Sequence, residues 1–427
     1  MYFCTKLSKT YKNMHKLQIL NIVEDILNRT QDCNGTFKDK IVHLNDEKYI
    51  KMFEPIQILQ NGSLVMFKYG NYSNIFNSKN NFDISYTNFW NLYDGLYRTL
   101  RSIVIDLDSC QIVTYPFDKF FNLNEMEETQ LENIQTMIKN AKSVEISDKL
   151  DGSMACARFY KGNFFATGST SIIREQSWRL DEIYRMIESD SKIQLMLKDN
   201  PNYTFIFESI TKSDVHVVVY DEENFGLNLI GIRDMDSLRL LSYKEVLDIG
   251  SKYGIKTTTV FNKTFNEILD SLDEKKSNEK EGFVFNIDGF YMKVKYNDYV
   301  LMHGMVSKMS SINIIIKNYA DGTIDDLLSK IPTAYQNRVL TIVNICHKYV
   351  SNINKRISFW YDKVKDMDIR DVGLYLSQNC DKDIRGYVIC KYKNIPYNVL
   401  KRGNSGYKKL TDIGVNPSEY YNLFEEI

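Results

Sequence analysis

The hydrophobic pattern of this chain changes near residue 303, and this change limits the possible folds more than any other feature. Before it, short β-type apolar runs recur between turn signals such as Asp288-Gly289. Beyond it, apolar residues recur three or four positions apart, as in Ile324, Leu327, Leu328 and Ile331. The first pattern is typical of strands and the second of amphipathic helices. The sequence therefore predicts an α+β protein with separate domains.

We place the predicted boundary between a strand-rich first domain at 1–303 and a helical domain at 304–427, with 1–75 only poorly assigned. In that first part we expect a helix at 16–27, strands within 49–67 broken at Asn61-Gly62, and a loop at 70–81. Further along, the patterns predict strands at 102–107, 111–115, 163–167, 203–210, 215–220, 227–233, 282–285 and 290–295, and helices at 127–142, 175–198, 243–253 and from 265. The charged run 273–280 is read as a solvated surface loop.

Composition excludes several classes of protein. The net charge is −1, so nucleic acid can bind only through local basic patches. The seven cysteines are scattered, which argues against a disulfide framework and a zinc knuckle and favours a reducing compartment. No apolar run has transmembrane length and no signal-peptide pattern begins the chain, so we expect a soluble, intracellular protein without a membrane partner. A Gly-x-x-x-x-Gly-Lys-Ser/Thr phosphate loop is also absent.

Lys149-Leu150-Asp151-Gly152-Ser153 lies between two strand-like runs. A lysine two residues before Asp-Gly fits the active-site signature of covalent nucleotidyltransferases, in which the amine attacks a nucleotide α-phosphate. The glycine is expected to permit a turn with unusual dihedral angles, and the aspartate to help hold a metal. Alone the match is weak, because Asp-Gly is a common hairpin turn.

Residues further along the chain supply what a nucleophilic lysine requires. Such a lysine must be deprotonated by nearby positive charge or by burial, and the reaction needs a divalent metal held by oxygen ligands. Glu208 lies within a strand, and Glu281 begins another. Lys293 and Lys295 alternate on a strand and so share a face, where an anion would account for two lysines together.

Five ordered segments resemble the motifs of the ATP-dependent ligase and capping-enzyme superfamily: Lys149–Gly152, Phe207-Glu208, Leu229–Arg233, Glu281–Val284 and Lys293–Lys295. The upstream segments Arg101–Val104 and Pro116–Glu125, the latter containing Lys-Phe-Phe-Asn-Leu-Asn-Glu, resemble the bacteriophage RNA ligase family of the tRNA-repair type. Ala320–Leu327 resembles that family's passage into its C-terminal helical domain. The resemblance runs from about residue 80 to about residue 330. It implies a nucleotidyltransferase domain of antiparallel sheets flanked by helices, followed by an all-helical domain.

The resemblance also implies a role for each matching residue. Lys149 would be the adenylated nucleophile, Arg101 and Lys119 would bind the β and γ phosphates of ATP, and Glu208 would contact the nucleoside. Asp151 and Glu281 would hold waters of a catalytic Mg²⁺, Asp325 would bind a second metal, and Lys293 and Lys295 would contact the α-phosphate and lower the pKa of Lys149. The chain departs from the family at Thr167, where a basic residue is usual before Gly-Ser, and at Ser102, where glycine is usual.

The implied activity is ATP-dependent ligation of a 5′-phosphate RNA end to a 3′-hydroxyl RNA end, through lysyl-AMP and an adenylated RNA end. Cleaved tRNA is an expected substrate, and a separate end-healing kinase or phosphatase an expected partner. Two alternatives remain: a nick-sealing ligase of the same superfamily, which a β-barrel after Glu281 would indicate, and a non-catalytic module that binds RNA ends. The intact Lys149, Glu208, Glu281, Lys293 and Lys295 argue against the second.

A basic segment lies in the helical region. Between Arg385 and Lys409 there are seven Lys or Arg and no Asp or Glu, with four tyrosines interleaved. Basic residues with aromatic rings suit an RNA-binding surface, and the alternative interpretation is a solvated helical face.

Overall fold

The computed structural model of the protein describes residues 18–70, 86–214, 216–274, 279–297, 299–300, 312–328, 333–402 and 406–414. The chain divides into two compact units, Met1–Tyr299 and Val300–Ile427, which are described separately below. Several predictions fall wholly or partly outside the described residues, among them the loop at 70–81 and the middle of the charged run 273–280.

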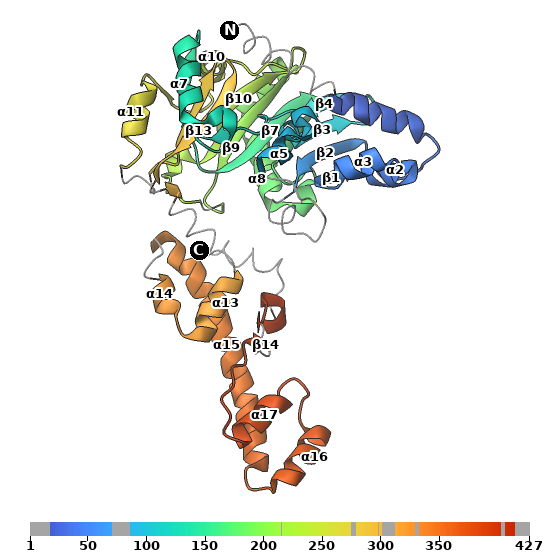
Figure 1. Ribbon diagram of the computed structural model, residues 1–427, viewed down its shortest axis with the longest axis vertical. Coiled ribbons are helices and arrows are strands. Elements are labelled where there is room, and N and C mark those ends of the chain that lie inside the picture. Colours follow the sequence, from blue (N-terminus) through green and yellow to red (C-terminus); the bar gives the residue numbers. More distant parts are fainter. Residues whose placement is uncertain are drawn as a thin grey trace. The chain divides into compact units, whose positions relative to one another are not determined.

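The N-terminal part of the first unit is a four-stranded antiparallel sheet with helices beside it. The strands are β1 (Ile56–Asn61), β2 (Leu64–Tyr69), β3 (Arg101–Asp106) and β4 (Gln111–Thr114), paired in that order. The helices are 18–29, α2 (Phe37–Leu44) and α3 (Glu47–Phe53), and Figure 1 shows the last two beside β1. Tyr49, predicted to begin a strand, lies instead in α3, because Asp46 caps that helix through the backbone N–H of Lys48.

This sheet gives a structural role to described residues of the N-terminal segment that the sequence left poorly assigned. Phe37, Phe53 and Phe67 pack ring against ring between the helices and the sheet. Burial of three aromatic side chains fixes β2 in place, since each ring removes a large apolar area from water. Because β2 pairs with β3, the N-terminal segment contributes directly to the region around Arg101.

Two further sheets complete the first unit. One has the order β10-β9-β7-β8 and the other the order β11-β6-β12-β13-β5. All pairings are antiparallel except β13 with β5. Their bounds are β5 Phe121–Asn122, β6 Val144–Lys149, β7 Ser153–Tyr160, β8 Asn163–Gly168, β9 Tyr203–Ile210, β10 Gly226–Asp234, β11 Val260–Phe261, β12 Gly282–Ile287 and β13 Phe290–Lys295.

Helices flank these sheets, as the sequence predicts, but two of the expected helices are divided. The structure has α5 (Tyr86–Asn91), α6 (Leu96–Thr99), α7 (Leu131–Asn140), α8 (Trp178–Ser189), α9 (Ser191–Asp199), α10 (Tyr243–Tyr253) and α11 (Phe265–Asp270). The predicted helix 175–198 breaks at Asp190, whose carboxylate accepts from the backbone N–H groups of Lys192 and Ile193 and caps α9. The predicted helix 127–142 is a 3₁₀ turn, Glu127–Thr129, followed by α7.

The predicted strand 215–220 is wrong, because residues 216–220 form an irregular segment. The backbone N–H of Val218 donates to Asp151 at 2.9 Å, and the Tyr220 hydroxyl accepts from the Asp151 backbone N–H at 2.7 Å. The backbone N–H of Val218, which in a strand would bond to a neighbouring strand, therefore bonds to Asp151, two residues after Lys149. Apolar alternation alone cannot reveal this use of the backbone.

The second unit is mainly helical, with α13 (Ile312–Asp321), α14 (Ile324–Leu328), α15 (Thr333–Val364), α16 (Ile369–Asn379) and α17 (Arg385–Tyr392). The expectation of an all-helical domain needs one correction, since β14 (Lys401–Arg402) and β15 (Gly406–Tyr407) form a short antiparallel pair. Ile342 and Ile357 of α15 contribute to two separate buried clusters. The described part of this unit contains no β-barrel.

The basic segment 385–409 makes many contacts within this unit. Arg385 donates to the carbonyls of Ser377 and Cys380, and Lys401 pairs with Asp321 at 3.1 Å. Three of the tyrosines, Tyr387, Tyr392 and Tyr397, pack against a buried cluster. These residues form hydrogen bonds, an ion pair and packing contacts that stabilise the second unit itself. The RNA-binding interpretation of this segment therefore stays a prediction.

Candidate active site

Lys149 is the last residue of β6 and lies across from Gly282 of β12. Its amine is 2.6 Å from one oxygen of Glu281, and the amine of Lys295 is 2.7 Å from the other. Glu281 is 3% exposed, so one buried carboxylate holds two lysines. The three residues come from β6, β13 and the start of β12, which pair side by side in the sheet.

Glycine residues permit this close packing. A Cβ on Gly282, whose φ is +155°, would lie 2.1 Å from the carbonyl oxygen of Val294. Gly152 is needed for a different reason from the one predicted: it does not have a positive φ, but a Cβ there would lie 2.5 Å from the carbonyl of Ser209. The glycine of the Asp-Gly sequence after Lys149 therefore lets β9 pack close to this segment, and it does not make a turn with a positive φ.

Carboxylates control the charge of Lys149. Burial would lower its pKa, but Glu281, Glu208 and Asp151 outweigh burial and raise it above the ordinary lysine value. Burial would likewise raise the pKa of Glu281, but Lys149 and Lys295 hold it below its usual range. This corrects the expectation of a lowered pKa at Lys149: without substrate, the amine is a paired ammonium. Nucleophilicity must come from a change in its surroundings.

Three other cations line one cavity of about 440 Å³ together with Lys149 and Lys295: Lys68, Arg101 and Lys293. None of these three forms an ion pair with a carboxylate among the described residues. Burial lowers the pKa of Lys293 well below the ordinary value, and the neighbouring cations Lys119, Lys149, Arg101 and Lys295 lower it further. Unpaired, partly buried cations that repel each other make a site for an anion.

The same cavity has an apolar wall, formed by side chains that include Phe117, Met154, Ile230 and Val284. Ile230 reaches it through a register shift between Leu229 and Gly231 in the pairing of β10 with β9. Phe117 lies against Gly231, where a Cβ would come within 2.5 Å of its ring. A cavity with one cationic and one apolar region suits a nucleotide, whose phosphates and base differ in this way.

Arg233 fixes the segment that carries Phe117. It is 1% exposed, and its guanidinium donates to the carbonyls of Tyr115, Pro116 and Leu238 at 2.8–3.2 Å. Its charge lies 3.9 Å from the centre of the Tyr115 ring. Arg233 therefore has a structural role that the sequence did not assign.

We expect Arg233→Met to lower the free energy of unfolding by about 3 kcal/mol or more, because three carbonyls, two of them in buried contacts, lose their donor. Urea unfolding of the purified protein measures the change. Arg239→Met is the matched control, since Arg239 forms an exposed ion pair with Glu245 and should contribute below about 1 kcal/mol. Equal effects of the two substitutions would contradict the structural role.

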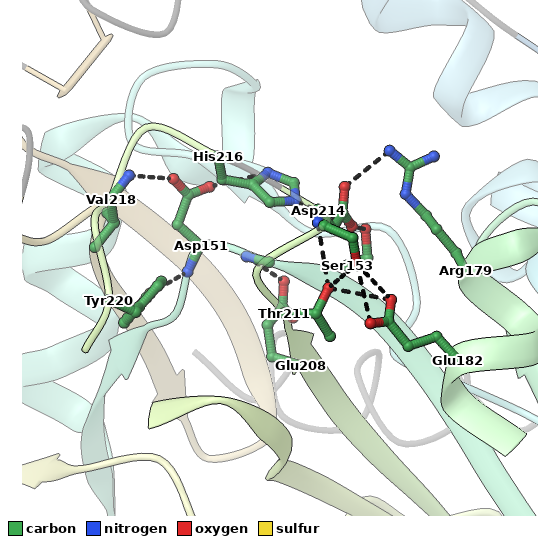
Figure 2. Close-up of polar contacts among 12 residues, drawn as sticks. Asp151, Ser153, Arg179, Glu182, Glu208, Thr211, Asp214, His216, Val218 and Tyr220 are labelled. Atoms are coloured by element: carbon green, nitrogen blue, oxygen red, sulfur yellow. Dashed lines mark hydrogen bonds and ion pairs between the residues drawn. The ribbon is translucent and has the colours of Figure 1, made fainter. Parts of the chain in front are cut away.

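Asp151 belongs to a polar network beside Lys149 (Figure 2). Its carboxylate accepts from Val218 N–H and from the Tyr299 hydroxyl, both at 2.9 Å. The imidazole of His216 lies between two carboxylates, 3.6 Å from Asp151 and 3.3 Å from Asp214. Asp214 in turn accepts from Ser153 and Arg179. The network ties the irregular segment 216–220 to the turn after Lys149.

The charge of His216 should contribute to stability in a pH-dependent way. Burial lowers its pKa, but Asp214 and Asp151 outweigh burial and raise it above 6.5. The protonated imidazole therefore stabilises the fold fully below pH 6.5, and this contribution is lost as pH rises through the raised pKa. We expect the thermal stability difference between wild type and His216→Gln to shrink from about pH 6 to about pH 9 in metal-free buffer. The exposed His43 is the control; a pH-independent difference for His216→Gln would contradict the assignment.

The structure brings some of the predicted site residues together and not others. Arg101, Lys149, Glu208, Lys293 and Lys295 line the cavity. Asp151 and Glu281 are not among the lining residues, and each accepts hydrogen bonds from protein donors. Lys119 is outside the lining, with its amine 5.1 Å from the ring centre of Phe121, and burial lowers its pKa to about 8. Asp325 is an exposed residue of α14 in the second unit, so its role stays a prediction.

Several lining residues were not singled out from the sequence. Lys68 belongs to a segment without a recognisable motif, and Ile230 reaches the cavity only because of the register shift in β10. Phe117 and Phe120 lie inside a segment used for the resemblance, but nothing in their spacing distinguished cavity lining from core. Which of these side chains line the cavity depends on how strands that are distant in sequence pair with each other, and the sequence does not give that pairing.

The carboxylates of Glu281 and Glu208 could bind a divalent ion that keeps most of its water ligands. The described residues contain no group of three or more side chains that could form a complete metal cage. Glu208 lines the cavity, and burial raises its pKa to about 7 although Lys149 opposes the shift. Mg²⁺ commonly binds through one or two carboxylates and substrate phosphates, so Glu281 and Glu208 are suitable acidic contacts. A bound Mg²⁺ would neutralise phosphate charge at this end of the cavity.

A strand-end lysine paired with a buried glutamate, next to a cavity with cationic and apolar regions, suits covalent transfer of a nucleotide to an amine. Residues 99–301 match the family model described as RNA ligase. Through this segment the chain is similar to the RNA ligase family. A curated protein of Thermovibrio ammonificans, named "Putative RNA ligase", is 26% identical over 291 residues, covering 64% of this chain and 73% of the relative.

Two solved structures are also similar. One is a Naegleria gruberi RNA ligase mutant with ATP and Mn, at 23% identity and a TM-score of 0.32, aligned over 40% of this chain and 55% of that one. The other is an archaeal ATP-dependent RNA ligase, at 11% identity and a TM-score of 0.40, aligned over 73% and 80%. This chain thus spans little more than half of the length of the Naegleria protein.

Among the residues that the structure describes, no helix has both the length and the apolar character needed to cross a membrane.

Proposed function

We propose that this protein joins a 5′-phosphate RNA end to a 3′-hydroxyl RNA end, using ATP and a divalent metal, with Lys149 as the covalently adenylated residue. The observation that carries the proposal is the cavity in which Lys149, held by Glu281, meets the unpaired cations Lys293 and Arg101. An amine and an anion site must share one space for attack on an α-phosphate to occur.

In the first step the Lys149 nitrogen bonds to the α-phosphorus of ATP. The α-phosphorus–oxygen bond to pyrophosphate breaks, pyrophosphate keeps the electron pair, and the ammonium loses two protons, so the phosphoramide nitrogen keeps one hydrogen. Lys293 and Lys295 are placed to stabilise charge that develops on the α-phosphate. Glu281 holds Lys149 charged before substrate arrives, and neutralising Glu281 by a bound cation would release the amine.

The second and third steps use the same cavity. The RNA 5′-phosphate oxygen attacks the α-phosphorus, and the bond to Lys149 breaks as its nitrogen takes a proton. The 3′-hydroxyl oxygen then attacks the 5′-phosphorus, loses its proton, and AMP leaves with the electron pair. Positioning and electrostatics drive each in-line transfer.

The substrate test uses three 5′-phosphorylated RNAs: a linear single strand, a nicked duplex, and an anticodon stem-loop cleaved in its loop. We expect sealing of the single strand or the cleaved loop to exceed sealing of the nick, because the described part of the second unit is mainly helical and lacks the barrel expected of a nick-sealing ligase. Preferred sealing of the nick would favour the nick-sealing alternative. Wild-type protein that binds RNA ends but forms no AMP adduct would favour the binding module.

Repair of cleaved tRNA is the biological role that we propose, with a separate kinase or phosphatase preparing the ends. The support is the match of residues 99–301 to the RNA ligase family model and the absence of a Gly-x-x-x-x-Gly-Lys-Ser/Thr loop from the sequence.

A further inference from the structure

Lys68 lies beside Arg101 because of a β-bulge at Ser102. In the pairing of β2 with β3, Phe67 opposes Ile103, but Lys68 opposes Arg101, so Ser102 is skipped. Directly opposed residues project to the same face, and skipping one residue moves Arg101 from the face of Ile103 to the face of Lys68. Both cations consequently line the cavity.

The bulge is held by a specific contact. Ser102 has a φ of +66°, which is costly for a residue with a Cβ, and its hydroxyl donates to the carbonyl of Ser169 at 2.7 Å. That bond fastens the Gly168-Ser169-Thr170 loop to β3. Ser169 and Thr170 line the cavity with Lys68 and Arg101, so the two segments form one wall.

The family usually has a basic residue at the position of Thr167, so this wall lacks the cation that the resemblance implies. Its side chain is 1% exposed, it opposes Cys156 in the β7–β8 pairing, and it is not part of the cavity lining. Lys68 supplies a cation to the same wall from a different sheet. It lies outside residues 99–301, so the family match assigns it no role.

Lys68 has no carboxylate partner among the described residues, and burial lowers its pKa. A partly buried ammonium without a partner is costly, and binding of an anion would relieve the cost. Arg101 beside it doubles the positive charge available to such an anion.

We propose that Lys68 binds the terminal phosphates of ATP and the departing pyrophosphate, in place of the basic residue absent at position 167. The inference rests on the proposed function. Lys68 would stabilise negative charge on pyrophosphate as the bond to the α-phosphorus breaks. Adenylated RNA has no γ-phosphate, and sealing releases AMP rather than pyrophosphate, so Lys68 acts in adenylation more than in sealing.

The test compares wild type with Lys68→Ala, Lys68→Arg and the control Lys139→Ala, an exposed lysine on α7 outside the cavity lining. Three rates are measured: lysyl-AMP formation against ATP concentration, its reversal against pyrophosphate concentration, and sealing of chemically pre-adenylated RNA. Lys68→Ala should raise the half-saturating concentrations of ATP and pyrophosphate by about 10- to 100-fold, the scale of one charge-assisted hydrogen bond. Lys68→Arg should recover most of the loss, and sealing should stay within about twofold.

Unchanged half-saturation by ATP and pyrophosphate in Lys68→Ala would overturn the inference while leaving the proposed function intact. An equal loss in adenylation and in sealing, with a lower melting temperature, would show a structural role and overturn it as well. A folded wild-type protein that forms no AMP adduct would overturn the proposed function, and the role of Lys68 with it.

Discussion

Lys149→Ala is expected to abolish the AMP adduct, reducing its rate of formation by at least about 1,000-fold. The nitrogen that bonds to phosphorus is removed, and no positioning effect can replace a missing nucleophile. Lys149→Arg should be equally inactive, because a guanidinium does not lose its proton in proteins. Incubation with α-labelled ATP and magnesium, followed by a denaturing gel, measures the adduct.

The same variant provides its own control. Sealing of pre-adenylated RNA does not need a lysine nucleophile, so Lys149→Ala should keep a substantial part of that activity. The fold should persist, since Glu281 still pairs with Lys295 when Lys149 is removed. Label on Lys149→Ala, or loss of sealing in a well-folded variant, would contradict the assigned role.

Lys293→Met should slow adenylation by about 100- to 1,000-fold and yet stabilise the substrate-free protein by about 1–2 kcal/mol. Lys293 lies among Lys119, Lys149, Arg101 and Lys295, and burial together with these cations lowers its pKa. Removing its charge removes an electrostatic cost in the empty cavity but also a cation that the transition state needs. Chemical unfolding and single-turnover adenylation measure the two effects.

Lys295→Met is a matched comparison on the same strand. Lys295 pairs with Glu281 at 2.7 Å, so its removal should destabilise the protein, by about 2 kcal/mol, while also slowing adenylation. Lys293→Met should thus raise the free energy of unfolding and Lys295→Met should lower it, whereas both variants should slow adenylation. Destabilisation by Lys293→Met similar to that by Lys295→Met would mean that Lys293 has a structural partner rather than an anion-binding role.

The sequence predicts much of the architecture because alternation and turn residues are local signals. The strands that carry Glu208, Lys293 and Lys295 lie where their patterns place them. The change of pattern after residue 303 likewise matches a mainly helical second unit. Hydrophobic periodicity reports which face of an element is buried, and that is enough for the fold class.

Features that depend on pairing between distant segments were not predictable. The β-bulge that aligns Lys68 with Arg101 requires the register of two strands about 30 residues apart. Segment 216–220 has an apolar alternation but gives its backbone donor to Asp151. The raised pKa of Lys149 arises from Glu281, which is distant in sequence and adjacent in space. Residue spacing along the chain does not predict which distant segments come into contact.

The pKa of Lys149 gives the site a resting state. If Lys149 is the adenylated residue that we propose, its paired ammonium would not attack phosphorus until the charge on Glu281 is neutralised. The cavity of unpaired cations would then bind the triphosphate. In that mechanism one carboxylate links substrate binding to activation of the lysine.

The most direct test of the central claim is the intact mass of the wild-type protein after incubation with ATP and magnesium, followed by peptide mapping of any adduct. The account predicts a mass increase of one AMP, located on the peptide that contains Lys149 and reversed by added pyrophosphate. A folded wild-type protein with no adduct, or an adduct on another residue, would contradict it.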